Sequence, residues 1–255
     1  MSGDAWDLTG RAVGHTYGGG LPALDGVDVA VPPGITALVG VNGAGKSTLM
    51  AILAGALKPS RGEVIAGAVD LYGWGRADAL RRIALMPQSL TLPGNLTTSE
   101  ALSVIASARG VTRRRIPQAV AEALEAVQLS ARADDRVRSL SGGMKRRLCL
   151  AQALVSDPIV LLLDEPTTGL DPEQRRAMID LVAGLRANVL MSSHIMEDVA
   201  EVAQRVVVLD AGRVAFAGSM GQMLERAPAD LTTAERRAEA AFLSIVMARR
   251  AESSP

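Results

Sequence analysis

A glycine-rich stretch near the start of the chain reads Gly40-Val41-Asn42-Gly43-Ala44-Gly45-Lys46-Ser47-Thr48. The apolar residues 35–40 before it predict a buried strand. Residues 47–57 after it predict a helix, which the following Lys58-Pro59 would stop. A strand, a glycine-rich turn and a helix in this order aim backbone N–H groups and the positive end of the helix at one point. The stretch is therefore typical of a phosphate-binding loop, and it favours an α/β core.

The residue types in this loop are those that bind a nucleoside triphosphate. The glycines let N–H groups turn inward around phosphate oxygens, Lys46 would reach the β- and γ-phosphates, and Ser47 would coordinate Mg²⁺. We expect the nucleotide to contact Gly40, Asn42, Gly43, Ala44, Gly45, Lys46, Ser47 and Thr48. A glycine-rich turn that binds nothing is the alternative, and the intact Gly-Lys-Ser disfavours it. Since kinases, GTPases and motor ATPases share such loops, the loop alone does not define the reaction.

A carboxylate pair narrows the choice. The apolar run Val160-Leu161-Leu162-Leu163 ends in Asp164-Glu165, and the carboxyl end of such a core strand would lie beside the phosphate-binding loop. There Asp164 could hold Mg²⁺ through its water shell, and Glu165 could act as general base on the attacking water. The alternative, a strand capped by an acidic turn, loses weight because the loop precedes it at a plausible separation.

The composition excludes several classes of protein. Of the 255 residues, 48% are hydrophobic and 21% are charged, and the formal net charge is zero. These values indicate an ordinary globular protein and argue against an electrostatic nucleic-acid binder. The single cysteine, Cys149, permits no intramolecular disulfide and is expected to be a small buried apolar residue. The longest apolar run, residues 159–163, has the length of a strand, so we expect no membrane span.

Hydrophobic periodicity predicts an alternating α/β core with a helical insertion at about residues 90–145. Residues 6–31 are expected to form N-terminal strands with tight turns. Further strands are expected at 63–71, 83–86, 159–163, 188–191, 206–209 and 213–217. Further helices are expected at 97–109, 117–127, 141–154, 173–185, 197–202 and 234–250. We assign residues 1–220 to one nucleotide-binding domain, and residues 221–255 to a C-terminal helical extension docked on it.

The segment Leu140-Ser141-Gly142-Gly143-Met144 is the most discriminating of all. Ser141 would cap a helix, while Gly142 and Gly143 would expose backbone N–H groups to a phosphate. An isolated Ser-Gly-Gly would be an ordinary cap. With the phosphate-binding loop and the acidic pair in this order, however, the chain resembles the ABC ATPase family, in which this segment is the signature motif. In that family the segment meets the γ-phosphate bound by a second subunit, so a complete site needs a dimer.

The resemblance implies roles for four further residues. Tyr17 resembles the aromatic residue that stacks on adenine, although a core tyrosine is the competing interpretation. Gln88 resembles the glutamine that approaches Mg²⁺ and the attacking water and links to the helical insertion. Asp171 lies in Gly169-Leu170-Asp171, which resembles the loop that crosses the dimer interface. His194 resembles the histidine that contacts the γ-phosphate, whereas a lone histidine is more often structural.

The same resemblance, over about residues 8–218, implies the fold and the function. It implies a P-loop NTPase core with an N-terminal antiparallel β-subdomain and an inserted α-helical subdomain. The implied function is hydrolysis of Mg-ATP between two ATP-binding subunits, and this hydrolysis drives a separate membrane permease. The subunits would lie at the cytoplasmic face of the membrane. No nucleic-acid partner is expected. Met144 departs from the glutamine most common in the family. The run from Ser141 to Leu148, with Ala23-Leu24-Asp25-Gly26-Val27 upstream, resembles bacterial drug and natural-product exporters, and residues 234–246 resemble their C-terminal extension. This resemblance implies export of a small molecule.

Three alternatives stay open at this point. A soluble ABC ATPase acting on ribosomes or nucleic acid would usually add a second ATPase unit, a long coiled coil or a basic extension. A small-molecule kinase would not carry the segment that begins at Leu140. A subunit that binds ATP without hydrolysing it would be expected to have lost Lys46, Asp164, Glu165 or His194. The sequence does not identify the transported substrate, and it does not separate a homodimer from a heterodimer.

Overall fold

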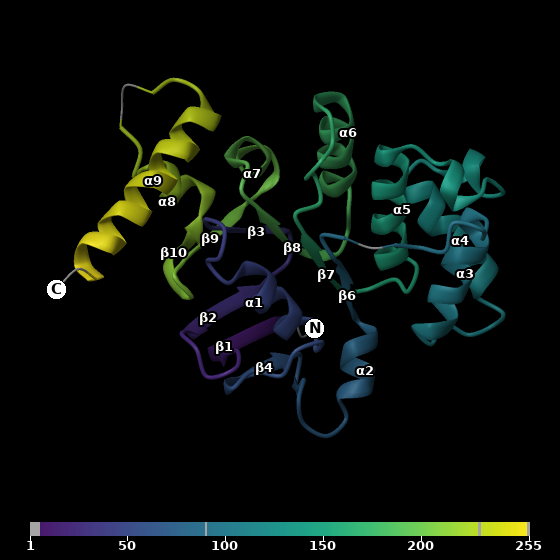
Figure 1. Cartoon of the computed structure of the whole chain (residues 1–255), viewed down its shortest axis with the longest axis horizontal. Helices are drawn as coiled ribbons and strands as arrows, with labels where there is room; N and C mark the ends of the chain where they lie inside the picture. The colour runs from purple at the N-terminus through teal and green to yellow at the C-terminus, as the bar shows by residue number, and fades with distance from the viewer. Residues whose placement is uncertain (1–5, 90, 229–230, 254–255) are drawn as a thin grey trace, which may run out of the picture.

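A six-stranded sheet forms the centre of the computed structural model, which describes residues 6–89, 91–228 and 231–253 (Figure 1). Its strand order is β10-β9-β3-β8-β7-β6, in which β10 alone is antiparallel to its neighbour. The strands are β3 (Ile35–Val39), β6 (Ile83–Met86), β7 (Val160–Asp164), β8 (Asn188–Ser193), β9 (Arg205–Asp210) and β10 (Arg213–Ser219). Every residue of β3 and β7 is buried. This explains why both read as unbroken apolar runs, as is usual for parallel strands covered on both faces.

A second, antiparallel sheet confirms the predicted N-terminal β-subdomain. Its order is β2-β1-β4-β5, with β1 (Leu8–Thr16), β2 (Pro22–Val31), β4 (Arg61–Ala66) and β5 (Val69–Asp70). The single strand predicted at 63–71 is wrong, because β4 and β5 are antiparallel partners on either side of a turn. Gly67 in that turn has a φ of 60°, a left-handed conformation that favours glycine.

Helix α1 (Lys46–Leu53) follows the glycine-rich loop, but it is shorter than the predicted helix at 47–57. Gly55 has a φ of 72°, which ends the helical conformation. The hydroxyl of Tyr72 lies 2.6 Å from the carbonyl oxygens of both Ile52 and Leu57 and donates a hydrogen bond there. A side chain from beyond β5 thus contacts both the last turn of α1 and the segment that follows it.

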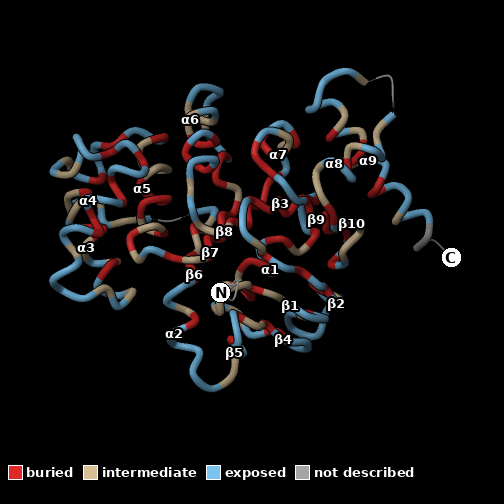
Figure 2. Tube along the Cα trace, turned by 180° about the vertical axis from the view of Figure 1, so that it is seen from behind, coloured by how far each residue is buried: buried red, intermediate tan, exposed pale blue. Residues whose placement is uncertain are grey.

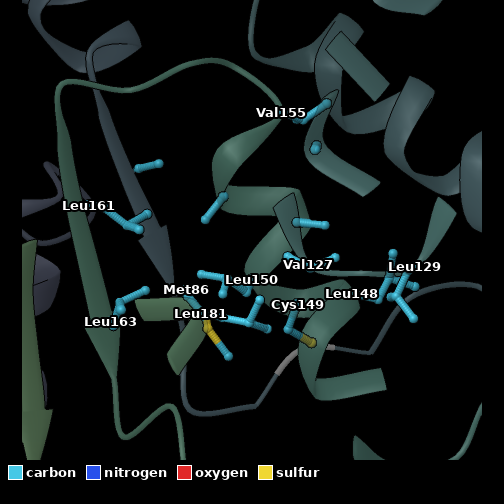
Figure 3. Packing of buried hydrophobic residues seen from close by; sticks show 14 of the residues in the cluster. Met86, Val127, Leu129, Leu148, Cys149, Leu150, Val155, Leu161, Leu163 and Leu181 are labelled. Carbon is cyan, nitrogen blue, oxygen red and sulfur yellow. The ribbon is translucent and has the colours of Figure 1, made fainter. Parts of the chain in front are cut away.

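The helical insertion contains α3 (Thr98–Ala108), α4 (Ile116–Ala126), two short 3₁₀ turns and the start of α5 (Gly142–Leu154). Thr97 begins α3 with a capping box, in which its side chain accepts from the Glu100 N–H and Glu100 accepts from the Thr97 N–H. Figure 3 shows that buried residues of α5 pack in one cluster with those of β6, β7 and the segment after α4. Cys149 lies in this cluster at 6% exposure, as expected. Because the core is continuous, α5 links the insertion to the sheet.

The remaining helices are α2 (Arg76–Arg81), α6 (Pro172–Ala183), α7 (Met196–Val202), α8 (Met220–Leu224) and α9 (Ala234–Ser253). Neither α2 nor α8 was expected from the sequence. The predicted C-terminal helix α9 docks on the core by burying Ala238, Ala241, Ile245 and Val246. Figure 1 shows α9 and the α3–α5 group at opposite ends of the six-stranded sheet, and Figure 2 shows the buried residues gathered between the sheet and its helices. Parts of the predicted domain ranges, residues 1–5, 90, 229–230 and 254–255, lie outside the described residues.

Candidate active site

The carboxyl ends of four parallel strands converge on one cleft. The glycine-rich loop follows β3, Glu165 follows β7, His194 follows β8, and Gln88 lies just after β6. In open α/β sheets this is the edge where ligands bind. The cleft has a volume of about 560 Å³ and is lined by Ala23, Asn42, Gly43, Ala44, Gly45, Lys46, Ser47, Thr48, Gln88, Glu165, Thr168 and His194.

The loop itself has the conformation that a phosphate cradle needs. Gly43 and Gly45 have φ values of 80° and 103°, in the region that favours glycine. A Cβ atom at Gly45 would lie 2.5 Å from the carbonyl oxygen of Ala23, and one at Gly40 would lie 2.3 Å from that of Leu209. The first glycine of the stretch is therefore required for packing, and the last for both backbone conformation and packing.

Lys46 is the first residue of α1, and its side chain turns back over the loop. Its ammonium group donates to the carbonyl oxygens of Gly40, at 2.8 Å, and Val41, at 3.4 Å. Burial lowers the pKa of Lys46, and the nearby carboxylates of Glu165 and Asp164 oppose that shift. The lysine is thus a desolvated cation at the N-terminus of α1, where it could bind phosphate oxygens strongly.

The acidic pair is fixed by a serine that the sequence analysis did not single out. The Ser192 hydroxyl donates to Oδ1 of Asp164 at 2.6 Å and accepts the Glu165 N–H at 2.8 Å. Asp164 is 8% exposed, and it lies opposite Ser192 in the β7–β8 pairing. The alternation of side chains on a strand turns Ser192 toward the pair, so register in β8 could have identified it.

Three polar side chains gather around the carboxylate of Glu165. Gln88 Nε2 and Thr168 Oγ1 donate to Oε2 at 3.3 and 2.9 Å, and His194 Nδ1 lies 3.4 Å from Oε1. The backbone of Glu165 has a φ of 48°, which costs a non-glycine residue on the order of 1–3 kcal/mol. Such strain is found where the surrounding structure imposes it, and here it aims a carboxylate into the cleft. Thr168 is a further contact that the sequence analysis missed.

The donor set fits the Mg²⁺ ion that the sequence analysis expected. Ser47 supplies a hydroxyl oxygen, Gln88 an amide oxygen, and Asp164 with Glu165 two carboxylates, all on one edge of the sheet. Hard oxygen ligands are what Mg²⁺ prefers, and the ion usually keeps several waters and binds substrate phosphates. Ser47 and Gln88 line the cleft directly, whereas buried Asp164 lies behind Glu165 and is not among the lining residues.

Tyr17 is not among the described residues that line the cleft, but it contacts Thr48, which is. Its side chain is 55% exposed, its hydroxyl lies 3.3 Å from Thr48 Oγ1, and its ring meets that of His15 edge-on at 4.6 Å between centroids. This exposure excludes the competing interpretation of a core tyrosine. An exposed ring next to the first turn of α1 is available to a flat base, and His15 is a neighbour that the sequence did not indicate.

The predicted signature segment lies elsewhere. Ser141 begins α5 as its N-cap, accepting the Met144 N–H at 3.3 Å. Asp171 begins α6 in the same way, accepting the Gln174 N–H at 2.8 Å. A Cβ atom on Gly143 would lie 2.6 Å from Gln174 Oε1, so the two helix starts are neighbours. Neither Ser141 nor Asp171 is among the described residues that line the cleft.

This combination of a parallel sheet, a phosphate loop and a carboxylate at the strand ends defines a P-loop nucleotide-hydrolysing protein. A family model described as "ABC transporter" matches residues 24–168, which is more than half of the chain. The chain belongs to the ABC transporter family, as its ATP-binding subunit, and the predicted fold class and ATPase activity are thereby confirmed.

Similar proteins include ATP-binding subunits of both directions of transport. The methionine import ATP-binding protein MetN of Caulobacter vibrioides is 38% identical over 85% of this chain and 68% of its own length. The Nod factor export ATP-binding protein I of Burkholderia pseudomallei is 38% identical over 79% and 67%. The match with the corresponding protein of Rhizobium meliloti is 39% identical and covers 76% of this chain and 59% of that protein.

Solved structures agree with the fold. CbiO1 of Clostridium perfringens, part of the ABC transporter complex CbiONQ, has a TM-score of 0.75 and 28% identity over 84% of this chain and 89% of its own. An ATP-binding subunit of an ABC transporter has a TM-score of 0.72 and 27% identity over 86% and 92%. Among the described residues, no helix combines the length and apolar character needed to cross a membrane.

Proposed function

We propose that two copies of this chain close on two Mg-ATP molecules and that the hydrolysis of ATP drives a separate membrane permease. In each cleft the loop residues from Gly40 to Thr48 and Lys46 bind the phosphates, and Tyr17 stacks on adenine. Ser47, Gln88 and Asp164 hold Mg²⁺, which balances charge on the phosphates when it is bound. Glu165 accepts a proton from the attacking water, and His194 contacts the γ-phosphate.

One observation carries the dimeric part of this proposal. Ser141, Gly142, Gly143 and Asp171 lie at neighbouring helix starts, outside the cleft that holds Glu165. A helix start with exposed N–H groups favours an anion, yet this one does not line its own cleft. A second copy would present its Ser141 to the γ-phosphate of the first, and the arrangement is reciprocal.

We further propose that the permease contacts this chain next to Gln88, and that transport runs in the direction of export. A groove of about 350 Å³ lies between the segment after Gln88 and α5, lined by Thr91, Leu92, Gly94, Val137, Arg138, Lys145, Leu148 and Cys149. Because that segment leads directly from the active site, movement of Gln88 could reach a permease segment seated there. The complex would work at the cytoplasmic face of a membrane. Similarity to Nod factor export proteins supports export, and similarity to MetN supports the opposite direction.

The function is tested with a reconstituted complex. The chain is co-expressed with a candidate membrane permease, and ATP-driven movement of ethidium is followed in inverted membrane vesicles. Accumulation of the dye, absent with Lys46→Ala, would support export of a small amphiphile. ATP hydrolysis that the permease does not stimulate would contradict the coupling, and ATP-driven loss of preloaded dye would contradict the direction.

A further inference from the structure

Arg146 makes a set of contacts that the site described above does not account for. It lies in the second turn of α5, and its side chain is half-buried. The guanidinium donates to four backbone carbonyl oxygens: Pro166 at 2.9 Å, Asp164 at 3.2 Å, and Glu165 and Gln88 at 2.5 Å each. One side chain thus joins the loop that carries the general base to the segment that carries Gln88.

These contacts complete the anchoring of Glu165. Its N–H donates to the Ser192 hydroxyl, and its carbonyl oxygen accepts from Arg146, so the peptide groups on both sides of its Cα are held. The residue needs such anchoring because its φ of 48° is unfavourable for a side chain other than glycine. Burial lowers the pKa of Arg146, which indicates that its charge is desolvated and that the four carbonyl groups take the place of water.

The same helix begins at the signature segment. Ser141 is the N-cap of α5, and Arg146 lies five residues further along that helix. In the proposed dimer Ser141 faces the γ-phosphate of the other copy. A displacement of α5 by that contact would therefore move the guanidinium that fixes Glu165 and Gln88 in its own site.

We propose that Arg146 is a positioning residue that aligns Glu165 and Gln88 of its own site and ties their position to the signature helix of the same chain. This inference rests on the proposed dimer. Arginine is suited to the task because its planar fork reaches several acceptors in fixed directions, whereas a lysine ammonium is a single point charge. The remaining members of the site, Lys46 and the glycine loop, are not bonded to Arg146 and should bind nucleotide without it.

The first test compares Arg146→Gln and Arg146→Lys with Arg113→Gln, the same chemical change at an exposed residue between α3 and α4. We expect kcat to fall about 10²-fold in Arg146→Gln, the cost typical of a 1 Å misplacement of a reacting group. Arg146→Lys should recover little of that loss. The affinity for a fluorescent ATP analogue, the KM and the melting temperature should stay close to those of Arg113→Gln. Equal kcat in Arg146→Gln and Arg113→Gln, or parallel losses of affinity and folding, would overturn the inference.

A double-mutant cycle with Glu165→Gln separates positioning from general damage. If Arg146 acts through Glu165, Arg146→Gln should cost far less in single-turnover rate when Glu165→Gln is already present. Independent costs that multiply would overturn a role through Glu165.

Mixed dimers, purified through two different tags, decide which site Arg146 serves. When Arg146→Gln is combined with a Lys46→Ala copy, the surviving cleft contains the altered arginine, and we expect it to be inactive. When both changes share one chain and the other is wild type, the surviving cleft has its own Arg146 and should be active. The reverse pattern would overturn the assignment to its own site. A wild type that hydrolyses no ATP would contradict the proposed function itself, whereas an active wild type with an equally active Arg146→Gln contradicts this inference alone.

Discussion

The Oε1 atom of Glu165 lies 3.4 Å from Nδ1 of His194, so the ends of strands β7 and β8 meet at one carboxylate. Gln88 and Thr168 donate to the other oxygen of Glu165. The carboxylate of Glu165 is thus contacted from the ends of β6 and β8 and from its own loop.

Replacing Glu165 with glutamine should separate binding from turnover. The amide has almost the same shape but accepts a proton poorly, so phosphate release should fall about 10²–10⁴-fold. Nucleotide affinity should persist, because the loop from Gly40 to Thr48 is unchanged. Size-exclusion chromatography with Mg-ATP should show the variant as a stable dimer.

The matched control is Glu63→Gln, which makes the same chemical change at an exposed residue of β4 that pairs with Arg11. It should leave turnover unchanged. Steady-state phosphate release by Glu165→Gln within about threefold of wild type would exclude the role of general base.

The specific activity of the isolated chain should rise with protein concentration. Ser141 and Asp171 are absent from the described lining of their own cleft, so a complete site requires two copies to meet. Phosphate release per molecule is measured over a range from nanomolar to micromolar protein, with the dimer fraction followed by light scattering. Activity that is high and constant while the protein is monomeric would contradict the shared site.

Tyr17 should contribute to affinity rather than to the rate of hydrolysis. Its exposed ring is held edge-on by His15, and stacking of a base on an aromatic ring is worth about 1–3 kcal/mol by alanine substitution. Tyr17→Ala should weaken binding of a fluorescent ATP analogue accordingly, with kcat preserved. Tyr17→Phe keeps the ring and loses only the hydroxyl near Thr48, so it should bind almost as wild type. Equal loss in both variants would contradict stacking.

Tyr72 should make the folded chain sensitive to alkaline pH. Burial raises the pKa of Tyr72 to about 12; Arg76 lowers it and Asp70 raises it further. The folded state favours the neutral phenol, so this stabilisation is complete below about pH 10 and is lost as the pH rises toward about 12.

Tyr72→Phe should cost about 1 kcal/mol near neutrality by removing the hydrogen bond at the end of α1, and the stability of the variant should fall less steeply above pH 10. Denaturant unfolding at several pH values, with Tyr17→Phe as control, measures both effects. Identical slopes for Tyr72→Phe and wild type would contradict this assignment.

The parts of the fold that the sequence predicted are those that depend on local pattern. The apolar runs of β3 and β7 indicated buried strands, and the glycines and Lys46 between β3 and α1 indicated the phosphate loop. The predicted end of α1 was wrong, because residues 54–57 include good helix formers. Gly55 adopts a left-handed conformation there, and the Tyr72 hydroxyl from beyond β5 contacts the carbonyl oxygens of Ile52 and Leu57 on either side of it.

The candidate site shows the same division. Glu165 could be named from its place after a core strand, and Gln88 and His194 from the resemblance to the ABC ATPase family; the structure brings the three together. The sequence analysis did not single out Ser192, Thr168 or Arg146. Register in β8 could have identified Ser192, whereas the importance of Arg146 lies in contacts across the fold. Arg146 reaches a carbonyl group 58 residues away in the sequence, at Gln88, and no periodicity in the chain records such a contact.

The shared site makes its sharpest prediction for two variants that are each inactive. Ser141→Arg should abolish hydrolysis with little change in nucleotide affinity, because Ser141 lies outside the cleft of its own chain and a bulky side chain would block the opposing γ-phosphate. Lys46→Ala should weaken ATP binding directly, since it removes the desolvated ammonium group from the phosphate loop.

Mixing these two variants tests the geometry itself. A mixed dimer has one cleft with both defects. Its other cleft has neither, because Lys46 there comes from the Ser141→Arg chain and Ser141 comes from the Lys46→Ala chain. Phosphate release should return in the mixture, up to about half of the wild-type rate if each cleft works independently. Heterodimers are isolated through two different tags, so that failure to associate is not mistaken for failure to hydrolyse. Proven mixed dimers that stay as inactive as their parents would mean that the clefts are self-contained or obligately coupled. Single-turnover hydrolysis in the same dimers distinguishes the two, because coupled clefts would still complete one turnover and self-contained clefts would complete none.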